Sequence, residues 1–119
     1  MSITKIILGL SLLFSTYSYA DDEPRTKEYL HSSGIAYCLS KAERYKEEAS
    51  IAMEGYFQIG DHSVQAQNQV RKYIDQQIQK RLDGYQGSRM SAYLMRCLEI
   101  SYSEEYREQI DYALKHYNE

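Results

Sequence analysis

The sequence is poor in cysteine, and its two cysteines lack the neighbours that thiol chemistry uses. Cys38 and Cys97 lie far apart, form no CxxC or CxxCH motif, and have no histidine within four residues on either side. Catalytic and metal-binding thiols depend on such neighbours. These absences favour a structural role for both cysteines over a catalytic or metal-binding one.

The chain also lacks any useful stretch in which apolar and polar residues alternate with period two, any internal repeat and any low-complexity segment. Such alternation is the pattern of a half-buried strand. Apolar residues instead recur at i, i+3, i+4 and i+7, which is the spacing of one helix face. The pattern predicts an all-α protein.

A long apolar run is missing as well. The longest one, Ile6–Phe14, follows the basic Lys5 and precedes Ser18-Tyr19-Ala20, whose small residues fit a signal-peptidase cleavage site. This pattern is typical of a secretory signal peptide over residues 1–20, and the run is too short to span a bilayer as a mature helix. An N-terminal anchor helix is the alternative. Because no cysteine stands at the predicted cut near Ala20, we expect an exported chain without a lipid anchor, in a bacterial periplasm.

The mature chain, residues 21–119, is expected to be one small helical domain with a mildly acidic surface. Loss of Lys5 with the signal peptide changes the formal charge from −3 to −4. Such a surface argues against nucleic acid and anionic membrane as partners and fits a basic protein partner.

Two cysteines in an oxidising compartment most simply form one disulfide. Closing a loop of about 60 residues would stabilise the folded chain by about 4 kcal/mol in the chain-entropy model. The predicted fold is therefore a compact bundle of four to five short helices with one disulfide.

Each predicted helix has an apolar stripe that we expect to face inward. These stripes are Leu30, Gly34, Tyr37 and Cys38 in residues 25–41; Ala49, Ala52, Met53, Tyr56 and Phe57 in residues 45–59; Val70, Ile74, Ile78 and Leu82 in a third helix opened by Asp61 or Ser63; Met90, Tyr93, Leu94, Cys97, Leu98 and Ser101 in residues 90–101; and Tyr106, Ile110, Ala113, Leu114 and Tyr117 in a last helix. The opposite face of the third helix is Gln, Lys and Arg, as expected of a solvated side.

Four local signals predict how the helices meet, begin and end. Gly34 in a helix interior costs roughly 1 kcal/mol relative to Ala, so we expect another helix to approach closely there. Ser40-Lys41-Ala42-Glu43 has capping-box spacing and is a candidate start for the second helix. Gly60 is expected to end that helix as a left-handed cap. The last helix has two candidate caps, Ser101 with Glu104 three residues later, or Ser103 followed by Glu104 and Glu105.

The search for chemistry finds no catalytic residues, no metal site and no cofactor site. The histidines, His31, His62 and His116, are scattered, and Ser33 and Ser88 lie in no nucleophile-elbow context. Paired acids such as Glu47-Glu48 are better explained as helix-surface charges than as a general acid and base. The thirteen tyrosines favour a binding protein instead, since tyrosine and arginine are enriched at protein interfaces.

The order of three short motifs carries a resemblance to a known family. Tyr37-Cys38-Leu39 in the first helix is followed by Met53–Gly60, reading MEGYFQIG, and then by Arg96–Ser103, reading RCLEISYS. Two Cys-Leu pairs around a GYF-x-x-G segment, downstream of a signal peptide, resemble the fourth Tai family of type VI secretion amidase immunity proteins. The resemblance spans roughly residues 29–114.

The resemblance implies a function that composition alone does not. Members of this family are small, all-α and often dimeric, and they inhibit the fourth Tae amidases, secreted papain-like cysteine enzymes that cut the D-glutamate–diaminopimelate bond of peptidoglycan. It implies a cognate amidase as partner, a homodimer, and a possible 2:2 complex with the toxin. It also implies a Cys38–Cys97 disulfide, with Gly55, Tyr56, Phe57 and Gly60 as packing and turn positions.

Blocking an enzyme cleft requires a protrusion that fills it, and one long loop stands out in the sequence. We expect the toxin-binding residues in this glycine-flanked loop: Gly84, Tyr85, Gln86, Gly87, Ser88 and Arg89. Two other functions stay open. One is a periplasmic acid-stress chaperone, and the other is a small envelope enzyme or ligand carrier, which the missing catalytic constellation argues against.

Overall fold

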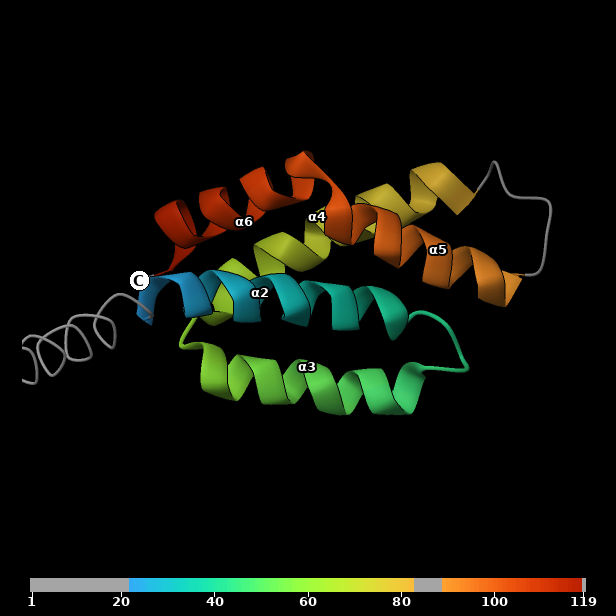
Figure 1. The fold of residues 1–119 in the computed structure, drawn as a ribbon, viewed down its shortest axis with the longest axis horizontal. Coiled ribbons are helices and arrows are strands. Elements are labelled where there is room, and N and C mark those ends of the chain that lie inside the picture. The colour runs from blue at the N-terminus through green and yellow to red at the C-terminus, as the bar shows by residue number, and fades with distance from the viewer. Residues whose placement is uncertain (1–21, 83–88, 119) are drawn as a thin grey trace, which may run out of the picture.

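The computed structural model describes residues 22–82 and 89–118, and this part of the chain is helical. Five helices follow one another: α2 (Asp22–Leu39), α3 (Lys46–Gly60), α4 (Val64–Leu82), α5 (Arg89–Tyr102) and α6 (Glu104–Tyr117) (Figure 1). The all-α prediction is confirmed, with no strand in these two ranges. None of the helices over these ranges has the length and hydropathy of a membrane span.

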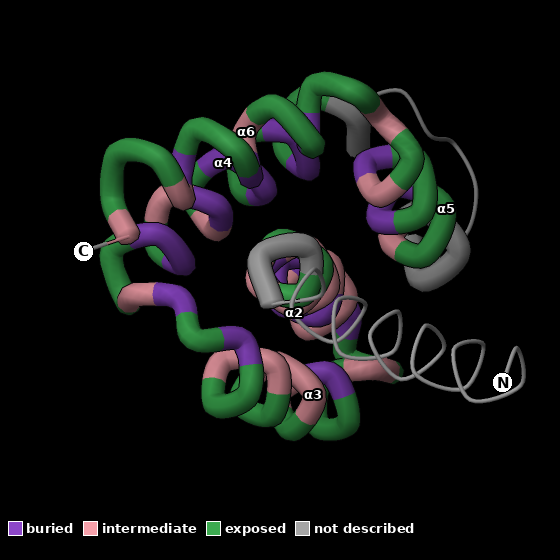
Figure 2. Tube along the Cα trace, turned by 60° about the vertical axis from the view of Figure 1, so that its left-hand side comes forward, coloured by how far each residue is buried: buried purple, intermediate pink, exposed green. Residues whose placement is uncertain are grey.

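The helix α2 is the centre of the bundle. It packs against all four of the other helices, and Figure 2 shows them arranged around it with buried segments turned inward. The core is formed by residues from all the helices except α3, chief among them Leu30, Ile74, Ile100, Tyr106 and Ile110. The helix α3 lies outside this core and packs mainly against α2.

The buried face of α5 differs from the predicted one. Leu94 and Leu98 were expected to face inward, but they are 37% and 45% exposed. Cys97 is buried as predicted, but the residues buried beside it are Arg96 and Ile100. The buried face is therefore rotated toward Arg96, whose charge is compensated by an ion pair with Glu99 at 2.8 Å.

The end of α3 also differs from the prediction. Gly60 is the last helical residue and has no positive φ, whereas Asp61 takes the left-handed conformation at φ 54°. Gly60 is needed for space, because a Cβ there would stand 2.6 Å from His62 Nδ1 and 2.9 Å from Tyr29 Cβ. Asp tolerates the left-handed region better than most residues do.

Serine hydroxyls cap the first turns of α4 and α6. The Ser63 hydroxyl accepts from the Ala66 amide at 3.0 Å at the start of α4, and the Ser103 hydroxyl accepts from the Tyr106 amide at 3.2 Å at the start of α6. Both follow the predicted capping pattern. The suggested capping box at Ser40 does not form, since the Ser40 hydroxyl donates to the Tyr37 carbonyl and α3 begins only at Lys46.

Candidate functional site

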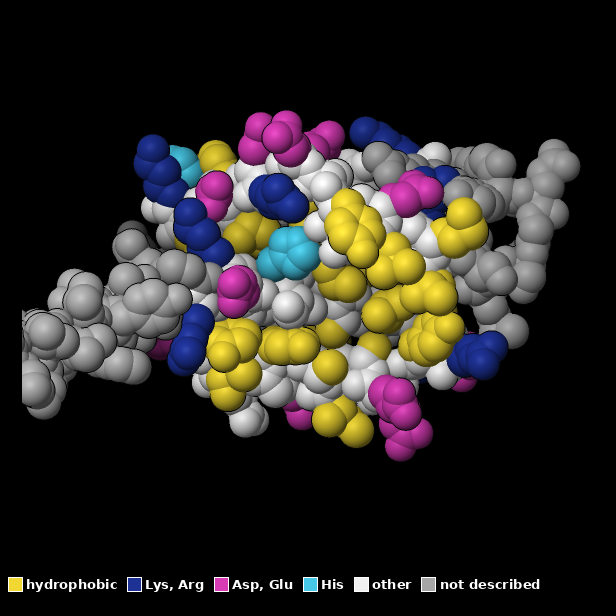
Figure 3. All heavy atoms as spheres, viewed as in Figure 1, with side chains coloured by type: hydrophobic (Ala, Val, Ile, Leu, Met, Phe, Trp, Pro, Cys, Tyr) yellow, Lys and Arg dark blue, Asp and Glu magenta, His cyan; other side chains and the backbone are white. Residues whose placement is uncertain are grey.

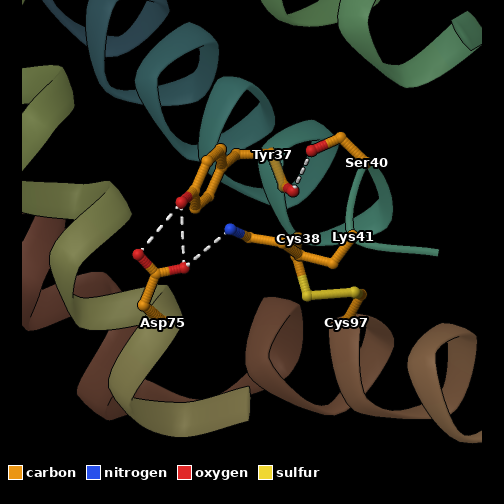
Figure 4. Close-up of polar contacts among 6 residues, drawn as sticks. All are labelled: Tyr37, Cys38, Ser40, Lys41, Asp75 and Cys97. Carbon is orange, nitrogen blue, oxygen red and sulfur yellow. Dashed lines mark hydrogen bonds and ion pairs between the residues drawn. A yellow bond between two sulfur atoms is a disulfide. The ribbon is translucent and has the colours of Figure 1, made fainter. Parts of the chain in front are cut away.

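A disulfide joins the central helix to α5. Cys38 and Cys97 are fully buried, with their Cα atoms 5.8 Å apart, and the bond between them confirms the predicted pairing (Figure 4). It closes a loop across a sequence separation of 59 residues. The bond therefore fixes α5 against α2 and limits how far the two helices can move relative to each other.

Gly34 lies where α2 meets two other helices. A Cβ at this position would overlap the Tyr106 hydroxyl of α6 and stand 2.7 Å from Val70 Cγ1 of α4. The hydroxyl of Tyr106 donates to the His31 carbonyl at 2.6 Å, so the contact also ties α6 to the backbone of α2. The close approach anticipated at Gly34 is present.

The GYF-x-x-G segment lies on α3 and is only partly packed. Tyr56 is half-buried with its ring 6.2 Å from that of Tyr29, and Phe57 meets the ring of His62 edge-on at 5.2 Å. Gly55 is exposed, and nothing lies within 4 Å of the place where its Cβ would stand. Packing within the chain does not explain this glycine.

The predicted toxin-binding loop falls mostly outside the described residues. Gly84, Tyr85, Gln86, Gly87 and Ser88 belong to that gap, and Arg89 begins α5 without a described side chain. The segment joins α4 to α5, and the ends of these two helices that it links lie at the same end of the bundle (Figure 1).

Tyr37 organises a polar cluster between α2 and α4 (Figure 4). Its hydroxyl donates to both carboxylate oxygens of Asp75, at 2.9 and 3.0 Å, and Lys41 Nζ lies 3.3 Å from the same carboxylate. The hydrogen bond with Tyr37, together with Asp75, raises the pKa of Lys41, although partial burial opposes the shift. Two cations lie over the tyrosine ring, with Lys41 Nζ 4.5 Å and Arg71 Cζ 5.2 Å from its centroid.

His31 joins α2 to α5, and His62 joins the α3–α4 connection to α4. His31 Nε2 lies 3.0 Å from the Ser101 carbonyl oxygen, and His62 Nε2 lies 3.1 Å from Gln67 Oε1. Burial lowers the pKa of both imidazoles, which favours their neutral forms at neutral pH. Among the residues that the structure describes, no group of three or more histidine, cysteine or carboxylate side chains could hold a metal ion.

A groove lies on each side of α3. The α2–α3 groove has a volume of about 490 Å³ and is lined mainly by α2 and α3, with His31 and Ile35 on its α2 side and Ser101 at its edge. The α3–α4 groove has a volume of about 530 Å³ and is lined by Ser50, Met53, Glu54, Phe57, Gln58, Val64, Gln67, Asn68 and Arg71. Ile51 and Ile59 of α3 are exposed and line neither groove. No pattern in the sequence indicates either groove, because each forms between separate helices.

Exposed apolar side chains gather beside the α2–α3 groove. Leu94, Met95, Leu98 and Tyr102 form an outer stripe on α5, with Tyr102 76% exposed. Figure 3 shows apolar side chains collected over α2, α3 and α5 on this face. Such a patch on a small protein is typical of a protein-binding surface.

A family model matches residues 25–110, which include the disulfide, both grooves and the first half of α6. Its description is type VI secretion system amidase immunity protein, Tai4. The chain belongs to the Tai4 family. No curated protein matches the chain.

Proposed function

We propose that this chain is a periplasmic immunity protein that binds its cognate secreted cysteine amidase and covers the active-site cleft. The single observation that supports this most is the Tai4 match, which covers residues 25–110. The cognate enzyme would be the peptidoglycan amidase that cuts the D-glutamate–diaminopimelate bond. The immunity protein itself needs no catalytic group, since it acts by occupying the place of the substrate.

The bundle suits this task because an inhibitor that is rigid before binding loses less conformational entropy in the complex. The Cys38–Cys97 disulfide and the close packing of Tyr106 on α2 hold α2, α5 and α6 together as a frame. On this frame we place the cleft-filling element in the segment from Gly84 to Arg89. That segment begins two residues after the end of α4 and ends at the first residue of α5.

The pairing is tested by co-expressing the mature chain, residues 21–119, with the amidase encoded beside it. The two proteins should co-purify through size exclusion. An amidase that elutes alone from an equimolar mixture contradicts the proposed function.

The placement of the loop is tested by replacing residues 84–90 with a short Gly-Ser linker. The variant should keep its helical circular dichroism and lose most of its inhibition. A folded variant that inhibits as well as the natural chain rules out this segment as the cleft-filling element.

The proposal includes export and a two-fold assembly. Cleavage near Ala20 would release the chain into the periplasm, and the mature protein would form a homodimer that binds two toxins in a 2:2 complex. The apolar outer stripe of α5 supports a further protein contact of this kind. Mass spectrometry of the periplasmic protein and light scattering of the complex test the two statements separately.

A further inference from the structure

Arg71 has an unusual position among the cations of this chain. It is half-buried, its Nε is buried without a hydrogen-bond partner, and no carboxylate within the described ranges pairs with it. The other lysines and arginines with described side chains are exposed, except Arg96, which pairs with Glu99. A half-buried guanidinium normally has an anionic partner, because burial penalises a charge that is not compensated.

The guanidinium of Arg71 is held in place before any partner arrives. Its Cζ lies 5.2 Å from the centroid of the Tyr37 ring, and the hydroxyl of Tyr37 is fixed by two hydrogen bonds to Asp75. Asp75 is in turn engaged by Lys41 at 3.3 Å. A planar cation stacked on an aromatic ring loses little freedom on binding and presents its remaining N–H groups in a fixed fork.

Arg71 lies at one end of the α3–α4 groove. Because α3 and α4 run in opposite directions (Figure 1), Ser50 lies toward the Arg71 end, and Phe57 and Val64 lie toward the other end. The walls between these ends include the amides Gln67 and Asn68. The groove therefore combines an apolar end, a middle able to hydrogen-bond a peptide backbone, and a cationic end.

We propose that the α3–α4 groove receives an extended, acidic segment of the cognate amidase, and that Arg71 binds a carboxylate of that segment. This inference rests on the proposed function, since it takes the amidase as the partner. It adds a second contact, in the groove between α3 and α4, to the one proposed for the segment that joins α4 to α5. Arginine is enriched among the residues that dominate binding energy at protein interfaces, and a guanidinium binds a carboxylate through two parallel hydrogen bonds.

The dimensions of the groove define the segment it fits. Val64 and Arg71 are separated by seven residues of helix, or about 10 Å. An extended chain covers that distance in about three residues. The fitting segment therefore carries an apolar side chain and a carboxylate about three residues apart. Glu54 also lines the groove, and its carboxylate repels an acidic side chain of the bound segment. This repulsion directs the acidic side chain to Arg71.

The test compares Arg71→Gln with Lys72→Gln in the full mature chain, using the purified amidase and calorimetric titration. Both variants lose one positive charge from α4, but Lys72 is exposed and does not line the groove. Arg71→Gln should bind the amidase about 30-fold more weakly or worse, the effect of truncating one partner of a desolvated charge pair. Lys72→Gln should stay within about threefold of the natural chain, as rim charges do.

Two further measurements separate binding from folding. Arg71→Lys keeps the charge but not the planar fork, so it should still bind about tenfold more weakly than the natural chain. Thermal melts of all variants should show cooperative unfolding. If Arg71→Gln does not fold, the affinity of Arg71→Lys for the amidase tests the contact by itself. Raising the salt concentration from about 50 mM to about 500 mM should weaken binding of the natural chain more than that of Arg71→Gln.

The outcomes distinguish this inference from the proposed function. If the natural chain binds the amidase and both Arg71 variants bind equally well, the Arg71 contact is wrong and the proposed function stands. If the natural chain does not bind the amidase at all, the proposed function fails and this inference fails with it. Equal losses of affinity in Arg71→Gln and Lys72→Gln would also overturn it, because the net charge of α4, and not the position of Arg71, would then determine the affinity.

Discussion

Two glycines in neighbouring helices have opposite surroundings. Gly34 lies under the side chains of Tyr106 and Val70, whereas Gly55 faces open space on α3. Glycine destabilises a helix interior relative to alanine by about 1 kcal/mol in both places. Only at Gly34 does packing within the chain compensate that cost.

The two glycines therefore predict opposite effects of the same substitution. Gly34→Ala should lower the free energy of unfolding by about 1–3 kcal/mol, because the added methyl group forces Tyr106 and Val70 to move. Gly55→Ala should raise it by about 0.5–1 kcal/mol, because nothing obstructs the methyl group and helix propensity improves. Urea denaturation of both variants measures this. A Gly34→Ala protein as stable as the natural one would show that the close approach is not real.

The buried histidines predict a dependence of stability on pH. The ordinary pKa of histidine is 6.5, and burial lowers that of His31 and His62 in the folded chain. As the pH falls below 6.5, the unfolded chain binds protons before the folded one does. Stability that is fully present above this pH is therefore lost progressively as the pH falls toward the depressed pKa values.

Thermal melts across this pH range should show a falling melting temperature below pH 6.5. His62→Gln should reduce the slope, because the substitution removes one of the two imidazoles whose pKa burial lowers. A slope that is the same in the natural chain and in His62→Gln would remove His62 from the explanation. An acid-stress chaperone would instead gain dye-binding apolar surface and suppress aggregation at low pH.

At the scale of the helices, the interior face of α5 is defined by Cys97 and Ile100. Ile100 is 1% exposed, whereas Leu98 is 45% exposed although it lies next to Cys97 in the sequence. Ile100→Ala should therefore cost about 2–5 kcal/mol of stability, and Leu98→Ala should change it by less than about 0.5 kcal/mol. Chemical denaturation of the two variants measures the difference. A larger loss of stability in Leu98→Ala than in Ile100→Ala would instead support the inward face that the sequence pattern predicts, with Leu98 in the core.

Hydrophobic periodicity predicted the helices well because each is set by local spacing. The stripe of Val70, Ile74 and Ile78 in α4 is buried as expected, as are Tyr106, Ile110 and Ala113 in α6. The pattern failed on α5 because Leu94 and Leu98 are apolar but exposed, while the polar Arg96 is buried with Glu99 beside it. Periodicity cannot distinguish an apolar side chain in the core from one at a binding surface.

The candidate binding surfaces could not be predicted from the sequence for a different reason. Arg71 belongs to the Gln-, Lys- and Arg-rich face of α4 that the pattern indicates as solvated. Its half-burial depends on Tyr37 of α2, and the groove beside it depends on α3, so only the packed bundle places these groups together. The Cys38–Cys97 pair was predictable because only one pairing of two cysteines exists.

At the scale of the whole molecule, the described helices differ in how firmly they are joined to the central helix α2. The central α2 is fixed to α5 by the disulfide and to α6 through Tyr106, whereas α3 packs mainly on α2 and has a groove on each side. This division suits a protein that must keep its shape while a large partner covers it. In the proposed complex the frame holds the segment from Gly84 to Arg89 in the amidase cleft, and the α3–α4 groove binds an acidic segment outside it.

Hydrolysis of purified peptidoglycan by the cognate amidase, titrated with the mature chain, tests the central claim most directly. We expect cleavage of the D-glutamate–diaminopimelate bond to stop once the chain reaches a one-to-one ratio with the enzyme, and the chain alone to release no fragments. Undiminished hydrolysis in the presence of an excess of folded chain would contradict the account.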